Sequence, residues 1–233
     1  MTYLLKLETY KRMGHLDNEI TSLKNNLIEM FLLVQKQLRK SVVALNTLDK
    51  NLAREVLVNE RRVNAEELKI DKDCENFVAL FNPVAIDLRF VFAAFKINSH
   101  LESIGDSAKG ISKFVLEMDK TFDTHLLQEL QLEKMYQMVN TMIEDNVRAL
   151  RNDDTSQARL VFTTDVEVDA INRQATSVVA GHLANGHPDV VPLLNLISII
   201  RRLERVGDLT SNIAEEIIFY LEAKVLKHEK EKG

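Results

Sequence analysis

Residues that interrupt regular secondary structure are scarce in this chain of 233 residues, which contains 7 glycines and 3 prolines. A β-sandwich or β-barrel requires a turn about every 8–12 residues, and such turns are rich in glycine and proline. The chain has too few of these residues for either fold. With 45% hydrophobic and 28% charged residues, its composition is that of a folded globular protein and not of a disordered chain. The sequence therefore predicts long helices joined by few turns.

Disulfides, long apolar runs and an excess of positive charge are also missing. Cys74 is the single cysteine, so no internal disulfide can form and a reducing compartment is favoured. The net charge of −5 disfavours a nucleic-acid partner. The longest strongly apolar run, residues 190–200, contains Pro192 and is far shorter than the roughly 20 residues of a membrane-spanning helix. Charged residues follow the first leucines closely, so we expect no cleavable signal, no direct membrane insertion and a cytoplasmic protein.

Apolar side chains recur at helical spacing through most of the chain and predict six helices. Asp49 stands in the position of an N-cap before the second of them, and Pro83 is expected to begin the third. The clearest break is the loop at residues 184–188. The expected helices cover about residues 18–48, 49–81, 83–119, 123–150, 154–183 and 188–228.

The second half of the sequence repeats the first. The matched residues are Asp49, Ala53, Glu60, Glu102, Gly105 and Asp106 in the first half and Asp154, Ala158, Asp165, Glu204, Gly207 and Asp208 in the second. The first three pairs are 105 residues apart (154 minus 49) and the others 102 (204 minus 102). Such self-similarity indicates a duplicated unit. We predict an all-α fold of two tandem three-helix bundles, at residues 1–120 and 121–233.

Acidic side chains fall on apolar faces of the expected helices. At 100° per residue, Glu102 and Asp106 share the line of Leu88, Phe92 and Phe95, which we expect to face the core. The acids placed in this way are Glu60 on the second helix, Glu102 and Asp106 on the third, Asp165 and Asp169 on the fifth, and Glu204 and Asp208 on the sixth. Neighbouring carboxylates repel, and partial burial raises the cost to several kcal/mol. A multivalent cation removes that cost, and oxygen ligands suit hard ions.

Two further possibilities stay open for these acids. They could form exposed ion pairs with Arg201 and Arg205, each of which precedes an acid of the sixth helix by three residues, on a plain helical scaffold. They could also belong to a carboxylate-bridged metalloenzyme. No histidine is preceded three residues earlier by a glutamate, however, so the Glu-x-x-His ligands of ferritin-like bundles are missing. A glycine within a helix costs about 1 kcal/mol relative to alanine, so the recurrence of Gly105 and Gly207 indicates close approach of a backbone or room for a bulky ligand shell, and helix crossing alone would also require it.

Two stretches resemble the signature of the PhoU family of phosphate-signalling proteins. The stronger is Leu-Glu-Arg-Val-Gly-Asp at residues 203–208, continued by Asn-Ile-Ala-Glu-Glu at 212–216. The other comprises Asn-Pro-Val-Ala at residues 82–85, Asp-Leu-Arg at 87–89 and Leu-Glu-Ser-Ile-Gly-Asp at 101–106, and looks like the first-repeat counterpart. The resemblance extends over about residues 26–221.

This resemblance implies two tandem three-helix bundles, usually in a homodimer, without enzymatic activity. It implies a negative regulator of phosphate uptake that links the ATPase subunit of the phosphate ABC transporter to a membrane sensor histidine kinase. Family members carry metal ions, often multinuclear iron, so Fe³⁺, Mn²⁺ or Mg²⁺ is expected here. The implied ligand pairs are Glu204 with Asp208, Asp165 with Asp169, Glu102 with Asp106, and an incomplete pair, Glu60 with Asn64.

The first repeat departs from the family pattern at three positions. Ser103 stands where the family usually has arginine, Gly110 where it has asparagine, and Asn64 where it has an acid. The loss of one carboxylate and one amide weakens the hold on a highly charged ion. We therefore expect the second repeat to bind metal more strongly than the first.

Overall fold

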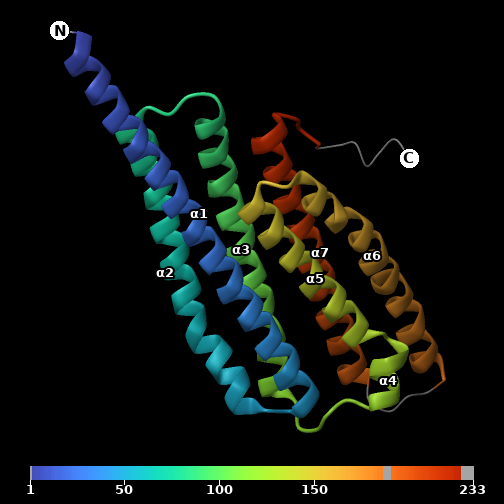
Figure 1. The fold of residues 1–233 in the computed structure, drawn as a ribbon. Coiled ribbons are helices and arrows are strands. Elements are labelled where there is room, and N and C mark those ends of the chain that lie inside the picture. The colour runs from blue at the N-terminus through green and yellow to red at the C-terminus, as the bar shows by residue number, and fades with distance from the viewer. Residues whose placement is uncertain (1, 186–189, 227–233) are drawn as a thin grey trace.

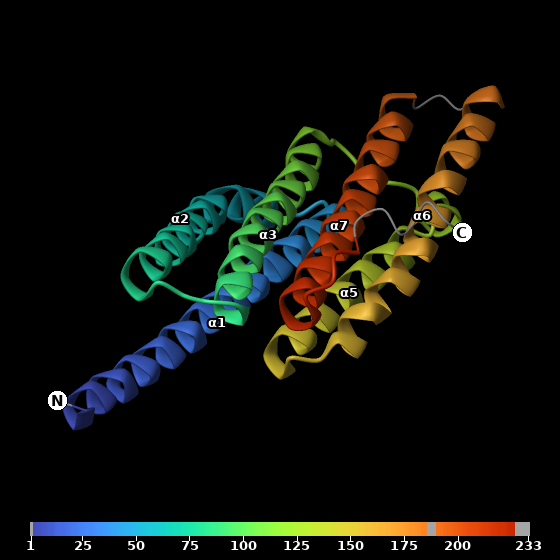
Figure 2. The ribbon, with the colours of Figure 1, turned by 90° about the horizontal axis from the view of Figure 1, so that it is seen from above.

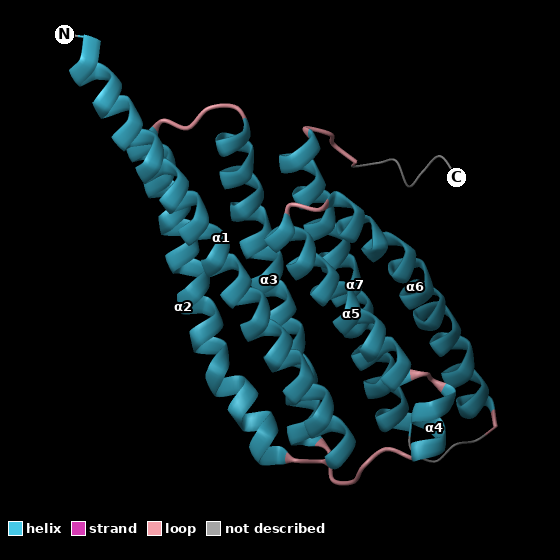
Figure 3. Cartoon of the chain, viewed as in Figure 1, coloured by secondary structure: helices cyan, strands magenta, loops and turns pink. Residues whose placement is uncertain are grey.

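The computed structural model describes residues 2–185 and 190–226, and within these ranges the chain forms seven helices and no strand (Figures 1 and 3). The helices are α1 (Thr2–Thr47), α2 (Lys50–Phe81), α3 (Ile86–Glu117), α4 (Thr124–Glu129), α5 (Leu132–Asn152), α6 (Thr155–Ala184) and α7 (Val190–Glu222). The prediction of an all-α fold is confirmed. None of the helices in these ranges has the length and apolar character required to cross a membrane.

The helices form two three-helix bundles in tandem, as predicted. Helices α1, α2 and α3 pack on one another, and α5, α6 and α7 do the same (Figure 2). The bundles join where α3 lies along α7 and α1 contacts α5, and buried side chains from all seven helices form one continuous core. Helices α3 and α7 run antiparallel to each other (Figure 1). Equivalent helices of the two repeats therefore meet at the centre of the molecule.

Aspartate caps begin the second helix of each repeat. The Asp49 carboxylate accepts hydrogen bonds from the backbone N–H groups of Asn51 and Leu52, both at 2.9 Å. Asp154, its repeat equivalent, accepts one from Ser156 at 2.9 Å. The N-cap predicted at Asp49 is confirmed. These caps satisfy N–H groups that lack a partner within the helix, and they fix where α2 and α6 begin.

The single helix predicted over residues 123–150 is wrong, because the chain breaks into α4 and α5. Gln131, between them, has a left-handed backbone with a φ of 52°. The flanking Leu130 and Leu132 are both buried, each 1% exposed. In a continuous helix these two leucines would point about 200° apart, so the core could not cover both. The turn at Gln131 lets both of them reach it.

The other helix boundaries differ from the predicted ones at the ends. Helix α1 begins at Thr2 instead of about residue 18. Helix α3 begins at Ile86 instead of Pro83, after Ala85 with a φ of 49°. Helix α7 ends at Glu222, and residues 188, 189, 227 and 228 of the predicted helix lie outside the described ranges.

Candidate metal centres

The acids of α3 lie along a line of this helix that the neighbouring helices leave open. Helices α1, α2 and α7 all pack against α3. Phe92 and Phe95, on the same line as Glu102 and Asp106, are 54% and 45% exposed, and Leu194 of α7 is 50% exposed. The expectation that this stripe faces the core is therefore wrong. Helical spacing shows which residues share a face, but not which face the neighbouring helices cover.

Three carboxylates converge between α2 and α3, and we name them the first cluster. They are Glu60 from α2 and Glu102 and Asp106 from α3, with one oxygen of each within 4.8 Å of the others. Glu60 is buried and Asp106 is exposed, so the cluster extends from the interior to the surface. The three residues predicted for this site are thus brought together. Their role as metal ligands stays a prediction.

A lysine lies inside the first cluster. The ammonium of Lys109 is 3.2 Å from Glu60 Oε1 and 3.1 Å from Asp106 Oδ1. Hydrogen bonding to Asp106, followed by that to Glu60, raises the pKa of Lys109. When the Asn64 amide is oriented so that both its nitrogen and its oxygen have suitable partners, the nitrogen donates to Glu60 Oε1 at 2.9 Å. The first cluster therefore contains its own cation. Lys109 was not predicted from the sequence, although its place three residues after Asp106 on one helix face was a signal.

The second cluster occupies the equivalent place between α6 and α7. Asp165 and Asp169 from α6 and Asp208 from α7 each have an oxygen within 4.8 Å of the others. Asp165 is buried, with 2% of its surface exposed. The Glu204 carboxyl lies close enough for these acids to affect its ionisation, and it accepts a hydrogen bond from Asn172. All four acids predicted for the second repeat therefore gather at one place.

The two repeated glycines hold neighbouring helices close together. A methyl group at Gly207 would lie 3.2 Å from Asp165 Oδ1 and 3.3 Å from Val168 Cγ1. A methyl group at Gly105 would lie 3.0 Å from Val63 Cγ1. Both glycines thus admit a valine of the facing helix. Gly207 also leaves room for the buried carboxylate of Asp165 beside the α7 backbone, so the second cluster has a space that a larger residue would fill.

The donor set of the second cluster fits a hard cation. Ser211 stands where the first repeat has Lys109, at the repeat offset of 102 residues (211 minus 109). Carboxylate oxygens from two helices, with one group buried, match the ligand preference of Mg²⁺, Mn²⁺ or Fe³⁺.

In each cluster the surroundings raise the pKa of a glutamate, Glu102 in the first and Glu204 beside the second. Burial, followed by the charges of Asp106 and Glu60, raises the pKa of Glu102. Burial, followed by the charges of Asp208 and Asp169, raises the pKa of Glu204. The crowding of negative charge therefore disfavours full ionisation in the metal-free protein. A bound cation would reverse this effect.

We expect metal binding by the second cluster to weaken as the pH falls from about 7.5 to about 5, because carboxylates must lose their protons to become ligands. The raised pKa of Glu204 moves this competition to a higher pH than an isolated glutamate would show. In the metal-free protein the same shift favours folding below the ordinary glutamate pKa, and this contribution is lost as the pH rises through the folded-state pKa. Calorimetric titration with Mn²⁺ at both pH values measures the effect. Affinity that does not change with pH would contradict it.

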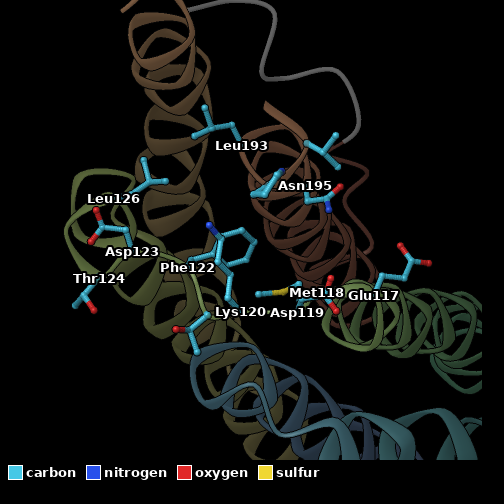
Figure 4. A pocket seen from close by; sticks show the side chains of 13 residues that line it. Glu117, Met118, Asp119, Lys120, Phe122, Asp123, Thr124, Leu126, Leu193 and Asn195 are labelled. Atoms are coloured by element: carbon cyan, nitrogen blue, oxygen red, sulfur yellow. The ribbon is translucent and has the colours of Figure 1, made fainter. Parts of the chain in front are cut away.

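A cavity lies away from both clusters, where the connection between α3 and α4 passes the first turns of α7 (Figure 4). Its volume is about 580 Å³, and its lining mixes apolar side chains such as Phe122 and Leu193 with acids such as Glu117 and Asp123. None of the acids of either cluster lines it. This cavity therefore plays no part in the candidate metal centres.

Fold and site together define an all-helical protein of two repeats, each with a carboxylate cluster between its second and third long helices. The PhoU domain family matches residues 27–115 and 132–217, one match in each repeat. The chain belongs to the PhoU family.

Relatives and solved structures agree with this assignment. The chain is 29% identical to the phosphate-specific transport system accessory protein PhoU of Edwardsiella tarda, over 92% of this chain and 88% of that protein. It is 30% identical to a PhoU homolog of the same description from Aquifex aeolicus, over 92% of this chain and 97% of that protein. The crystal structure of PhoU from Pseudomonas aeruginosa matches with a TM-score of 0.83 at 26% identity, covering 89% of this chain and 99% of that one.

Proposed function

We propose that this chain is a non-enzymatic regulator belonging to a phosphate-specific transport system. The observation that carries the proposal is the likeness over 92% of the chain to proteins described as accessory proteins of such systems. The match of both repeats to one family model supports it further. An accessory protein acts through what it binds, so we expect this chain to function by binding its partners.

We further propose an adaptor role, based on the resemblance of its motifs to the family signature. In this role a cytoplasmic homodimer contacts the ATPase subunit of the phosphate ABC transporter and a membrane sensor histidine kinase. By joining the two it acts as a negative regulator of phosphate uptake and of phosphate-responsive signalling. Each of its partners is a protein, and the chain itself does not enter the membrane.

We expect an affinity-tagged copy of the chain, expressed in its own host, to capture both the ATPase subunit and the kinase from detergent-solubilised cells. Growth at high and at low phosphate, followed by quantitative mass spectrometry, shows whether the association follows phosphate supply. A tagged helical protein from outside this family is the control. Absence of both partners at both phosphate levels would overturn the adaptor role.

Within this role we propose that the second cluster binds a hard multivalent cation through Asp165, Asp169 and Asp208, with Glu204 beside them. The oxygens within 4.8 Å of one another and the space beside Gly207 support this proposal. When bound, the cation would neutralise the crowded carboxylates and tie α6 to α7. The number of carboxylates also suits a multinuclear centre. In the first cluster, by contrast, the ammonium of Lys109 takes the place of a strongly held ion.

A further inference from the structure

A basic pocket lies in the groove between α3 and α7, on a chain whose net charge is −5. Its volume is about 340 Å³. Four cationic side chains line it, those of Lys109, Lys113, Arg202 and Arg205, against one acid, Asp106. Ser103 and Ser107 also belong to the lining, and their hydroxyls donate to the Glu102 carboxylate and to the Ser103 carbonyl. The pocket therefore gathers positive charge and hydrogen-bond donors at one place.

Most of this positive charge is not used by the protein itself. Lys109 is engaged with Glu60 and Asp106 of the first cluster. Among the described residues, no ion pair involves Lys113, Arg202 or Arg205. Three cations that converge with no ion pair among the described residues repel one another, and an anion placed between them removes that cost.

The guanidinium of Arg202 is held in place by packing. A methyl group at Gly110 would lie 2.3 Å from Arg202 Cζ, so the guanidinium lies directly against the α3 backbone. It also lies 5.8 Å from the centre of the Phe114 ring. Contacts of this kind fix the plane of the arginine without using its hydrogen-bond donors. The Arg202 side chain is therefore already ordered in the absence of a ligand, so binding loses little of its conformational entropy.

The duplication supplies an internal comparison. Because α3 and α7 are repeat equivalents and run antiparallel, the same groove contains a related cavity of about 380 Å³ at its other end. There the equivalent of Arg202 is His100, and the equivalent of Lys113 is Glu215. The related cavity is thus lined by an acid where the first has a lysine. The packing of α3 on α7 is therefore not sufficient to make a cavity basic. The positive charge of the basic pocket comes from the particular residues at its end of the groove.

We propose that the basic pocket binds a phosphate oxyanion, either inorganic phosphate or the phosphoryl end of a small phosphorylated molecule. A guanidinium donates two parallel hydrogen bonds to the oxygens of a phosphoryl group, and a lysine adds a point charge. Arg202 and Arg205 supply the guanidinium groups and Lys113 the ammonium. This inference goes beyond the proposed function, since it requires neither the transporter nor a bound metal.

Equilibrium dialysis of the full chain against radiolabelled inorganic phosphate, at constant ionic strength and both with and without a chelator, tests the proposal. We expect one saturable site, and we expect Lys113→Glu to lower its affinity by about tenfold or more. Lys72→Glu is the matched control, because it makes the same charge change on an exposed face of α2. It is expected to leave binding within about twofold. Arg202→Gln is a second variant that removes the held guanidinium, and thermal melting checks that each variant folds.

Three outcomes would overturn the proposal: no saturable binding by the unaltered chain, equal losses in the lysine variants of α3 and α2, and binding that the chelator abolishes. The last would place the phosphate on a metal ion of the carboxylate clusters. Competition with pyrophosphate distinguishes the two sources of the ligand. Stronger binding of pyrophosphate supports a larger phosphorylated molecule, and weaker binding supports free phosphate. Binding in the purified chain is independent of partner capture, so the two proposals can fail separately.

Discussion

Asp208→Ala is expected to lower the metal content of the purified protein by about tenfold or more, whereas Asn64→Ala leaves it nearly unchanged. Asp208 contributes one of three carboxylates that converge within 4.8 Å in the second cluster. Asn64 lies beside the first cluster, where it donates to Glu60 and where Lys109 already supplies positive charge. Metal content after reconstitution with Fe³⁺ or Mn²⁺, measured by mass spectrometry of the elements, gives the comparison.

A matched control separates ligand loss from a general loss of negative charge. Glu75→Ala removes one exposed carboxylate from α2, outside both clusters, and is expected to retain the metal. Thermal melting in the presence of chelator shows whether each variant folds. Equal metal content in the variants at Asp208 and Asn64 would contradict the assignment of the ion to the second cluster.

The parts of the fold that depend on local sequence were predictable. The aspartate cap of α2 uses a side chain and backbone groups only two and three residues apart, so Asp49 is sufficient to identify it. The long helices follow from apolar spacing and from the scarcity of glycine and proline. The break at Gln131 was not predictable in this way, because it results from the burial of both neighbouring leucines in a core assembled from distant helices.

The candidate metal centres show the same division. The sequence placed Glu60 and Asp106 at positions equivalent to Asp165 and Asp208, and the structure brings these acids together in each repeat, because duplicated units place equivalent residues at equivalent contacts. Which side of α3 would remain open was not predictable, because this depends on α7, which comes from the other repeat. The basic pocket likewise depends on the distance between Arg202 and Gly110, two positions separated by most of the second repeat.

Lys109→Ser is expected to lower the free energy of unfolding of the metal-free protein by about 2–3 kcal/mol, because it leaves a buried carboxylate without its cation. Glu60, whose side chain is 8% exposed, has the ammonium of Lys109 at 3.2 Å. Serine is the residue that the second repeat carries at this position, so the variant makes the two clusters more alike. Urea unfolding with chelator present measures the loss, and Lys72→Ser, at an exposed position, is expected to change stability by less than about 0.5 kcal/mol.

The same variant tests whether the lysine takes the place of a metal ion. Without the ammonium, Glu60, Glu102 and Asp106 keep their positions but lose their internal cation, so the cluster comes to resemble the second one. Added Mn²⁺ is therefore expected to restore part of the lost stability in Lys109→Ser, since a ligand that binds only the folded state stabilises it. The restoration should persist when Asp208→Ala removes the second site, because the new ion lies in the first repeat. A double variant that gains no stability from Mn²⁺ would show that Lys109 supports the fold without standing in for a cation.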